Sequence, residues 1–122
     1  MENANALKLI KKIQSDLITE GLVIENIVSD LKKLREYALL EEKPVLVKAI
    51  RLTYEHILEN EAFLIGIPND EPIEEDQIIN NEEADEENNL ESLQYILSLF
   101  KDIENKHNLA DLREYNTKLQ SF

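Results

Sequence analysis

The sequence contains no cysteine and no tryptophan, and it has only two glycines and three prolines in 122 residues. Without cysteine the chain has no disulfide framework, no thiolate zinc site and no cysteine nucleophile. Because a sandwich or barrel of short strands needs many turn residues, the scarcity of glycine and proline argues against those folds. Glycines at positions 21 and 66 alone also exclude glycine-rich phosphate-binding motifs. The composition therefore favours an all-α protein without a nucleotide-binding loop.

Long apolar runs are missing as well. No stretch approaches the length that a membrane-spanning helix requires. Residues 1–14 have an acidic second position and lysines within their apolar pattern, whereas a secretory signal peptide has a continuous apolar core. We therefore expect a cytoplasmic protein that does not interact with membranes.

Positive charge is absent from residues 66–89, which hold ten aspartates or glutamates and no lysine or arginine. The net charge of the chain is −13, and this acidic insert supplies −10 of it. The flanks are almost balanced, with 11 acids and 9 bases in residues 1–65 and 5 acids and 4 bases in residues 90–122. Nucleic acids and anionic membranes bind clustered lysine and arginine, so neither is an expected partner. The insert would instead attract a basic protein.

Apolar residues keep one heptad phase from Ala6 to Ala38, which predicts helix rather than strand. One row contains Ile10, Leu17, Ile24, Leu31 and Ala38, and the other contains Ala6, Ile13, Ile27 and Leu34. Because the phase is the same on both sides of Gly21, we predict a single long helix over residues 5–40. The alternative is a pair of helices broken at Gly21. The single helix is preferred because an isolated glycine costs a helix only about 1 kcal/mol.

Three further helices are predicted, over residues 45–64, 90–106 and 109–120. Pro44 suits the first turn of the second helix, and Gly66 followed by Ile67 and Pro68 is a stop signal. The fold class expected is an all-α bundle of about four helices, with a long first helix and a long acidic loop between the second and third. Residues 1–122 then form one domain, and the insert at 66–89 is expected to be partly disordered because its charge density opposes burial.

A broad apolar arc on the first predicted helix suggests contact with another protein chain. It comprises Leu22, Val23, Ile24, Ile27, Val28 and Leu31. One chain of this size offers little protein to cover so wide an arc, so we expect a homodimer. The possible interaction surface comprises Leu22, Val23, Ile27 and Leu31 together with the acidic residues Glu74, Glu75, Asp76, Glu82 and Glu83.

Two groups of residues resemble metal or acid–base sites in type. Glu104 and His107 form an E-x-x-H, but a di-metal carboxylate bundle needs a second copy and two further inward glutamates. Glu55, His56 and Glu59 supply an imidazole and two carboxylates with no fourth ligand in view. We therefore expect no catalytic residue, no metal site and no cofactor.

These observations favour a non-enzymatic helical protein-interaction module, similar in role to an adaptor, chaperone or inhibitor. Two alternatives stay open. One is a metal-carboxylate enzyme built on a helical bundle. The other is an acidic decoy that imitates nucleic-acid phosphates and blocks a basic protein.

Overall fold

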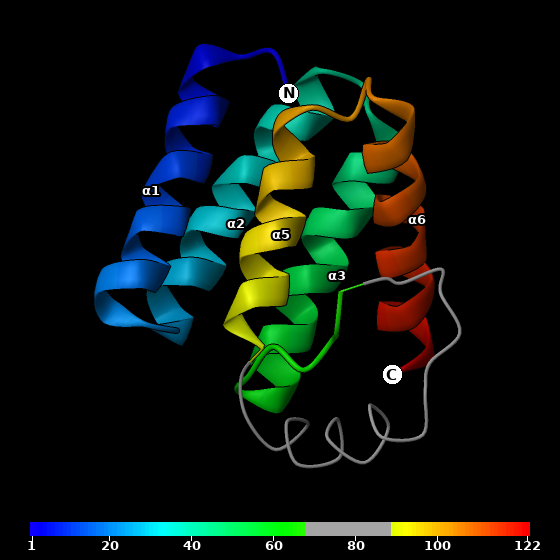
Figure 1. Ribbon diagram of the computed structural model, residues 1–122. Helices are drawn as coiled ribbons and strands as arrows, with labels where there is room; N and C mark the ends of the chain where they lie inside the picture. Colours follow the sequence, from blue (N-terminus) through cyan, green and yellow to red (C-terminus); the bar gives the residue numbers. More distant parts are fainter. Residues whose placement is uncertain (68–88) are drawn as a thin grey trace.

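The structure is a computed structural model that describes residues 1–67 and 89–122. Within these ranges the secondary structure is entirely helical (Figure 1). The helices are α1 (Ala4–Glu20), α2 (Ile24–Leu40), α3 (Pro44–Asn60), α5 (Leu90–Lys101) and α6 (Lys106–Ser121). The all-α prediction is confirmed for this part of the chain, but the predicted helix boundaries are not. No helix in the described ranges is long and apolar enough to cross a membrane.

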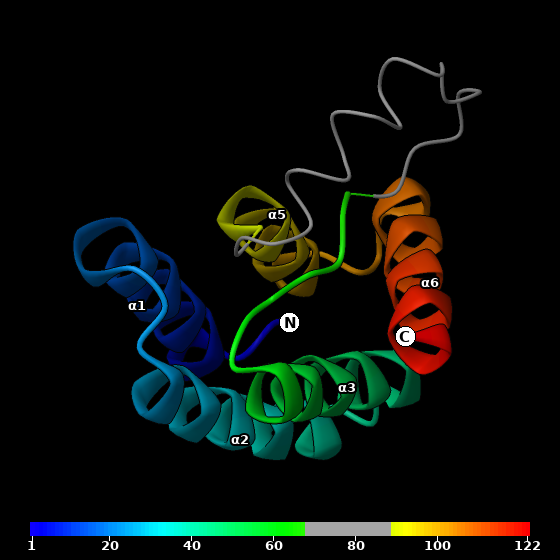
Figure 2. The same ribbon diagram turned by 90° about the horizontal axis from the view of Figure 1, so that it is seen from below.

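The helices surround one apolar core in the order α1, α2, α3, α6 and α5, and α5 packs back against α1 (Figure 2). Each helix contributes apolar side chains to this core, among them Ile10, Leu34, Ile50, Phe100 and Leu112. Helices α3 and α6 run in the same direction, so both begin at the same end of the bundle (Figure 1). This parallel pair brings the first turn of α3 alongside α6.

The predicted single helix over residues 5–40 is wrong, because the chain breaks at Gly21. Gly21 has φ 75° and ψ −158°, a combination that is essentially restricted to glycine. Helix α1 ends at Glu20, α2 begins at Ile24, and the two pack against each other. Each helix is amphipathic on its own, and the three-residue turn happens to preserve the heptad phase. The alternative with two helices is therefore the correct one.

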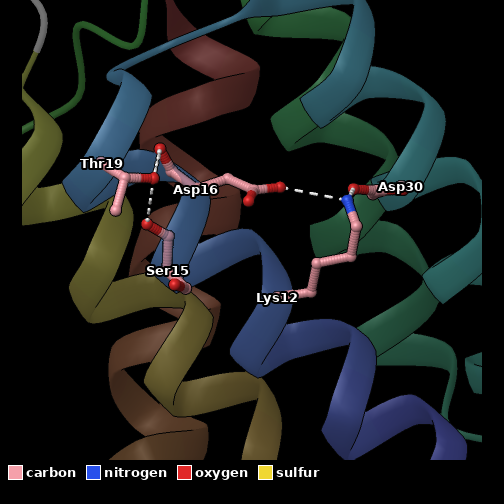
Figure 3. Close-up of polar contacts among 5 residues, drawn as sticks. All are labelled: Lys12, Ser15, Asp16, Thr19 and Asp30. Carbon is pink, nitrogen blue, oxygen red and sulfur yellow. Dashed lines mark hydrogen bonds and ion pairs between the residues drawn. The ribbon is translucent and has the colours of Figure 1, made fainter.

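An ion pair joins α1 to α2 (Figure 3). Lys12 Nζ lies 2.8 Å from Asp30 Oδ2 on α2 and 3.0 Å from Asp16 Oδ2 one turn along α1. The Asp30 side chain is only 10% exposed, whereas Lys12 is largely exposed. Hydrogen bonds to the two carboxylates, that to Asp30 foremost, raise the pKa of Lys12. Lys12 thus supplies a cation to a carboxylate that is mostly withdrawn from water.

Helix α3 ends at Asn60, before the predicted limit at residue 64. Glu61 takes a left-handed conformation with φ 55°, which turns the chain out of the helix. This turn places Phe63 and Ile65, both buried, in the core. The burial of two large apolar side chains outweighs the cost of about 1–2 kcal/mol for a non-glycine residue in this conformation.

The two chain segments that flank the acidic insert meet at one end of the bundle. The Asn89 N–H donates to Phe63 O at 2.7 Å, and the Asn89 side chain lies close to Gly66. Asn89 also caps α5 by accepting a hydrogen bond from the Ser92 N–H. The expected disorder of the insert concerns residues 68–88, which lie outside the described ranges. The hydrogen bond between Asn89 and Phe63 brings the two described ends of the chain together.

Helix α5 stops at Lys101 rather than at the predicted residue 106, and α6 begins at Lys106 rather than 109. Asn105 accounts for both differences, because its side chain accepts hydrogen bonds from the His107 and Asn108 N–H groups and so begins a new helix. The Met1 ammonium group donates to Phe100 O and Lys101 O at 3.1 and 3.0 Å. A cation therefore caps the negative end of α5.

Candidate functional site

Two of the four apolar residues predicted to form an interaction surface lie in the protein's own core. Ile27 and Leu31 are buried, Leu22 is half-buried against the core, and Val23 is 37% exposed. The placement of Ile27 and Leu31 on an external surface is therefore corrected. The fold-back of α2 onto α1 and α3 covers them, which a single long helix would not do. The homodimer prediction loses this support and stays a prediction.

The acidic half of the predicted surface lies outside the described residues. Glu74, Glu75, Asp76, Glu82 and Glu83 all fall between positions 68 and 88. Their charge is known from the sequence. The structure adds the positions of Ile67 and Asn89, the described residues on either side of this segment.

The E-x-x-H residues are separated by a helix boundary. Glu104 lies in the turn between α5 and α6, and His107 is exposed in the first turn of α6. Glu104 Oε1 pairs with Lys43 Nζ at 2.8 Å. This contact lowers the pKa of Glu104 and raises that of Lys43. The two residues therefore do not share one helical face, and the carboxylate is occupied by a lysine.

The His56 side chain is buried and hydrogen-bonded to the backbone. It is 6% exposed, and its Nε2 accepts a hydrogen bond of 3.1 Å from the Leu64 N–H. Its ring contacts Phe63 and Phe122 edge-on, at centroid distances of 5.5 and 4.6 Å. Burial lowers the pKa of His56, and the charge of Glu59 offsets this in part. The imidazole is thus an acceptor that holds the segment after α3 against the bundle.

A pair of tyrosines joins α5 to α6. Tyr95 donates a short hydrogen bond to Asp111, which raises the pKa of Tyr95 to about 12. The Tyr115 hydroxyl lies 2.7 Å from Ser92 Oγ, and its burial raises the pKa of Tyr115 further. Both phenols are protonated at neutral pH, so they act as hydrogen-bonding groups between helices rather than as bases. Within residues 1–67 and 89–122, no three histidine or acidic side chains gather where they could hold a metal ion.

A groove that the sequence analysis did not predict surrounds the first turn of α3. Three open cavities of about 280, 340 and 430 Å³ are all bordered by Pro44, and we call them together the Pro44 groove. The smallest reaches the turn between α5 and α6, the second follows α6, and the largest lies beside the end of α2. The lining residues are Leu39, Glu42, Lys43, Pro44, Val45, Val47, Lys48, Arg51, Ile103, Glu104, Leu109, Arg113, Asn116, Thr117 and Gln120.

The Pro44 groove carries more positive than negative charge, although the chain as a whole is acidic. Four cations and two carboxylates line it. Lys43 pairs with Glu104, and Arg51 pairs with Glu55 at 3.2 Å. Lys48 and Arg113 form no ion pair with any described residue. These two side chains are therefore available to an anionic group.

Little in the sequence indicates this groove. Lys48 and Arg113 lie 65 positions apart, and each looks like an ordinary charge on the polar face of its own helix. They meet only because α3 and α6 pack in parallel. The one local signal was Pro44, which fixes the start of α3 and removes an N–H donor there.

Comparison with known proteins found no matching family model, no matching curated protein and no matching solved structure.

Proposed function

We propose that this protein is a non-enzymatic interaction module whose acidic insert binds a basic protein. The observation that carries the proposal is the concentration of negative charge in one segment of the sequence. Residues 68–88 hold ten acids and no base, while the Asn89 N–H to Phe63 O hydrogen bond closes the bundle beside them. Negative charge is thereby concentrated in one segment of the chain, between the described helices α3 and α5.

Such a concentration of charge suits protein recognition. Complementary charge speeds the encounter of two proteins and disfavours partners of the wrong sign, and both effects weaken as salt rises. The decoy alternative is a special case of this function, in which the basic partner is a nucleic-acid-binding protein. The metal-carboxylate alternative has less support, because Glu104 pairs with Lys43 and His56 accepts a backbone N–H.

The proposal is tested by capturing proteins from a cell lysate on the immobilised chain at low and high ionic strength. A test variant neutralises three acids of the insert, with Glu74→Gln, Glu75→Gln and Asp76→Asn. The matched control neutralises three exposed helical acids, with Glu20→Gln, Glu25→Gln and Glu36→Gln. We expect a basic protein to be captured by the intact chain and by the control, to be lost from the test variant, and to be released by salt.

Equal loss from both variants would show that net charge alone matters and would contradict a role for the insert. Capture of a partner that is indifferent to salt and to both variants would contradict the electrostatic mechanism altogether.

A further inference from the structure

The Pro44 groove lies at the start of α3. Pro44 begins this helix, and the Phe63–Asn89 closure lies just beyond its end. The 17 residues of α3 separate the two ends by about 25 Å, at 1.5 Å per residue. The Pro44 groove and the Phe63–Asn89 hydrogen bond thus lie near opposite ends of α3, and the groove differs from the acidic insert in the sign of its charge.

We infer that the Pro44 groove binds an acidic peptide segment of a partner protein that also carries an apolar side chain. The charge complementarity comes from Lys48 and Arg113, which border the 340 Å³ cavity from α3 and α6 and have no carboxylate partner among the described residues. Lys43, which is 34% exposed, can exchange Glu104 for an incoming carboxylate because exposed pairs contribute little.

The apolar part of the ligand is accommodated beside the end of α2. The 430 Å³ cavity is lined by Leu39, Pro44 and Val47 between Lys43 and Lys48. Leu39 is 49% exposed, and its neighbour Leu40 is 79% exposed. An apolar side chain of the peptide docked here would cover leucine surface that water now contacts. Acidic residues next to it in the peptide would then face Lys43 and Lys48.

Asn116 gives the groove a polar group that lacks a full set of partners. The residue is 7% exposed, and its Oδ1 accepts no hydrogen bond from any described residue. Its Nδ2 donates only a long bond of 3.5 Å to Val45 O. Because this oxygen is itself buried, a peptide backbone N–H would reach it once the Asn116 side chain turned toward the groove.

The shape of the groove favours a peptide over other anions. Small molecules bind in concave sites that bury most of their surface, whereas these cavities are open and adjoin one another along the bundle end. A nucleic acid would require many more cations than the four that line the groove, two of which have carboxylate partners.

The inference is tested with a library of random 12-residue peptides displayed on phage and selected against the intact chain. Enriched peptides are then titrated into the ¹⁵N-labelled protein. We expect enrichment of sequences with several acids and one large apolar residue, and amide shift changes in residues 43–51 and 109–120. The double variant K48E/R113E should weaken binding about tenfold or more, and added salt should weaken it too.

The matched control is K8E/K33E, which makes the same change in charge at two exposed lysines outside the groove. The affinity of this control variant for the peptide should stay within about twofold of that of the intact chain. Salt largely screens charges outside the groove from the bound peptide. Circular dichroism of both double variants checks that they fold.

Three results would overturn the inference. One is the absence of acidic peptides among those enriched, and another is equal binding by K48E/R113E and K8E/K33E. The third concerns a variant in which all ten acids of the insert are neutralised: this variant selects acidic peptides, whereas the intact chain does not. That last outcome would assign the groove to the acidic segment of this chain or of a second copy.

Discussion

Gly21 is the residue on which the arrangement of the first two helices depends. Its backbone conformation is one that residues with a Cβ adopt only at a cost of about 1–3 kcal/mol. A Cβ at this position would meet no atom within 4 Å, so the cost is one of backbone strain and not of packing. We predict that Gly21→Ala lowers the free energy of unfolding by about 1–3 kcal/mol, measured by urea denaturation.

Gly66→Ala is the matched control for this prediction. Gly66 does not have a positive φ, and a Cβ there would make only an ordinary contact with Asn89 Nδ2 at 3.9 Å. Alanine also restricts the unfolded chain, so this variant should be neutral or more stable by up to about 1 kcal/mol. A stabilising Gly21→Ala would mean that α1 and α2 form one continuous helix after all.

His56 makes the stability of the fold depend on pH. Burial lowers its pKa below the ordinary value of 6.5, so the unfolded chain takes up a proton more readily than the folded chain. The contribution of His56 is fully present above pH 6.5 and declines as the pH falls from 6.5 to the lower pKa of the folded protein. Protonation of Nε2 would also remove the hydrogen bond from Leu64.

We therefore predict that the wild type is more stable than His56→Gln at pH values above 6.5, by about 1–2 kcal/mol, and that this difference shrinks below it. Carboxylates titrate in both proteins, so their effects cancel in the difference. His107→Gln, which makes the same substitution at an exposed histidine, is the matched control. An NMR titration that gives His56 a pKa of 6.5 or above would contradict the assignment.

At the scale of secondary-structure elements, substitution of Lys12 tests whether α1 and α2 pack as described. Removal of its charge leaves the carboxylate of Asp30 mostly buried without its cation. Lys12→Met keeps the length of the side chain and should lower the free energy of unfolding by about 1–3 kcal/mol. Lys11→Met, at an exposed neighbouring position with no ion pair to a described residue, should change it by less than about 0.5 kcal/mol. Equal effects of the two substitutions would contradict the interhelical ion pair.

The sequence allowed the helical class to be predicted, because apolar residues recur at helical spacing in every described segment. It did not allow the helix ends to be placed. Gly21 was compatible with a helix and with a break, and only the packing of α2 on α1 decides between them. Glu61 carries no turn signal, since its conformation follows from the burial of Phe63. Asn105 was a readable helix-capping residue that the E-x-x-H pattern obscured.

The two candidate sites, the acidic insert and the Pro44 groove, also differ in how far the sequence reveals them. The acidic insert is visible in the sequence because its charges are consecutive, and charge needs no fold to be recognised. The Pro44 groove was invisible because Lys48 and Arg113 come from different helices and meet only in three dimensions. Ile27 and Leu31 were misplaced for a related reason, since an apolar face does not reveal whether its own chain or another covers it.

At the scale of the whole molecule, negative charge is concentrated in one segment of the chain. The described residues carry 16 of the 26 acids and all 13 bases, so the bundle alone is close to neutral. Charge self-repulsion is consequently confined to the insert. Under the proposed function, the bundle would provide stability and the insert would attract a partner.

The most direct test measures the free energy of unfolding of the intact chain and of a variant in which residues 70–86 are replaced by a short Gly/Ser linker. The Phe63–Asn89 hydrogen bond holds the ends together in both proteins, and a shorter loop costs slightly less to close, about 0.6 kcal/mol for each halving of its length. The account predicts equal helicity by circular dichroism and a stability that is unchanged or higher by up to about 1 kcal/mol. A variant that loses cooperative unfolding, or about 3 kcal/mol or more, would show that Ile73, Ile78 or Ile79 belongs to the core and that the insert is part of the fold.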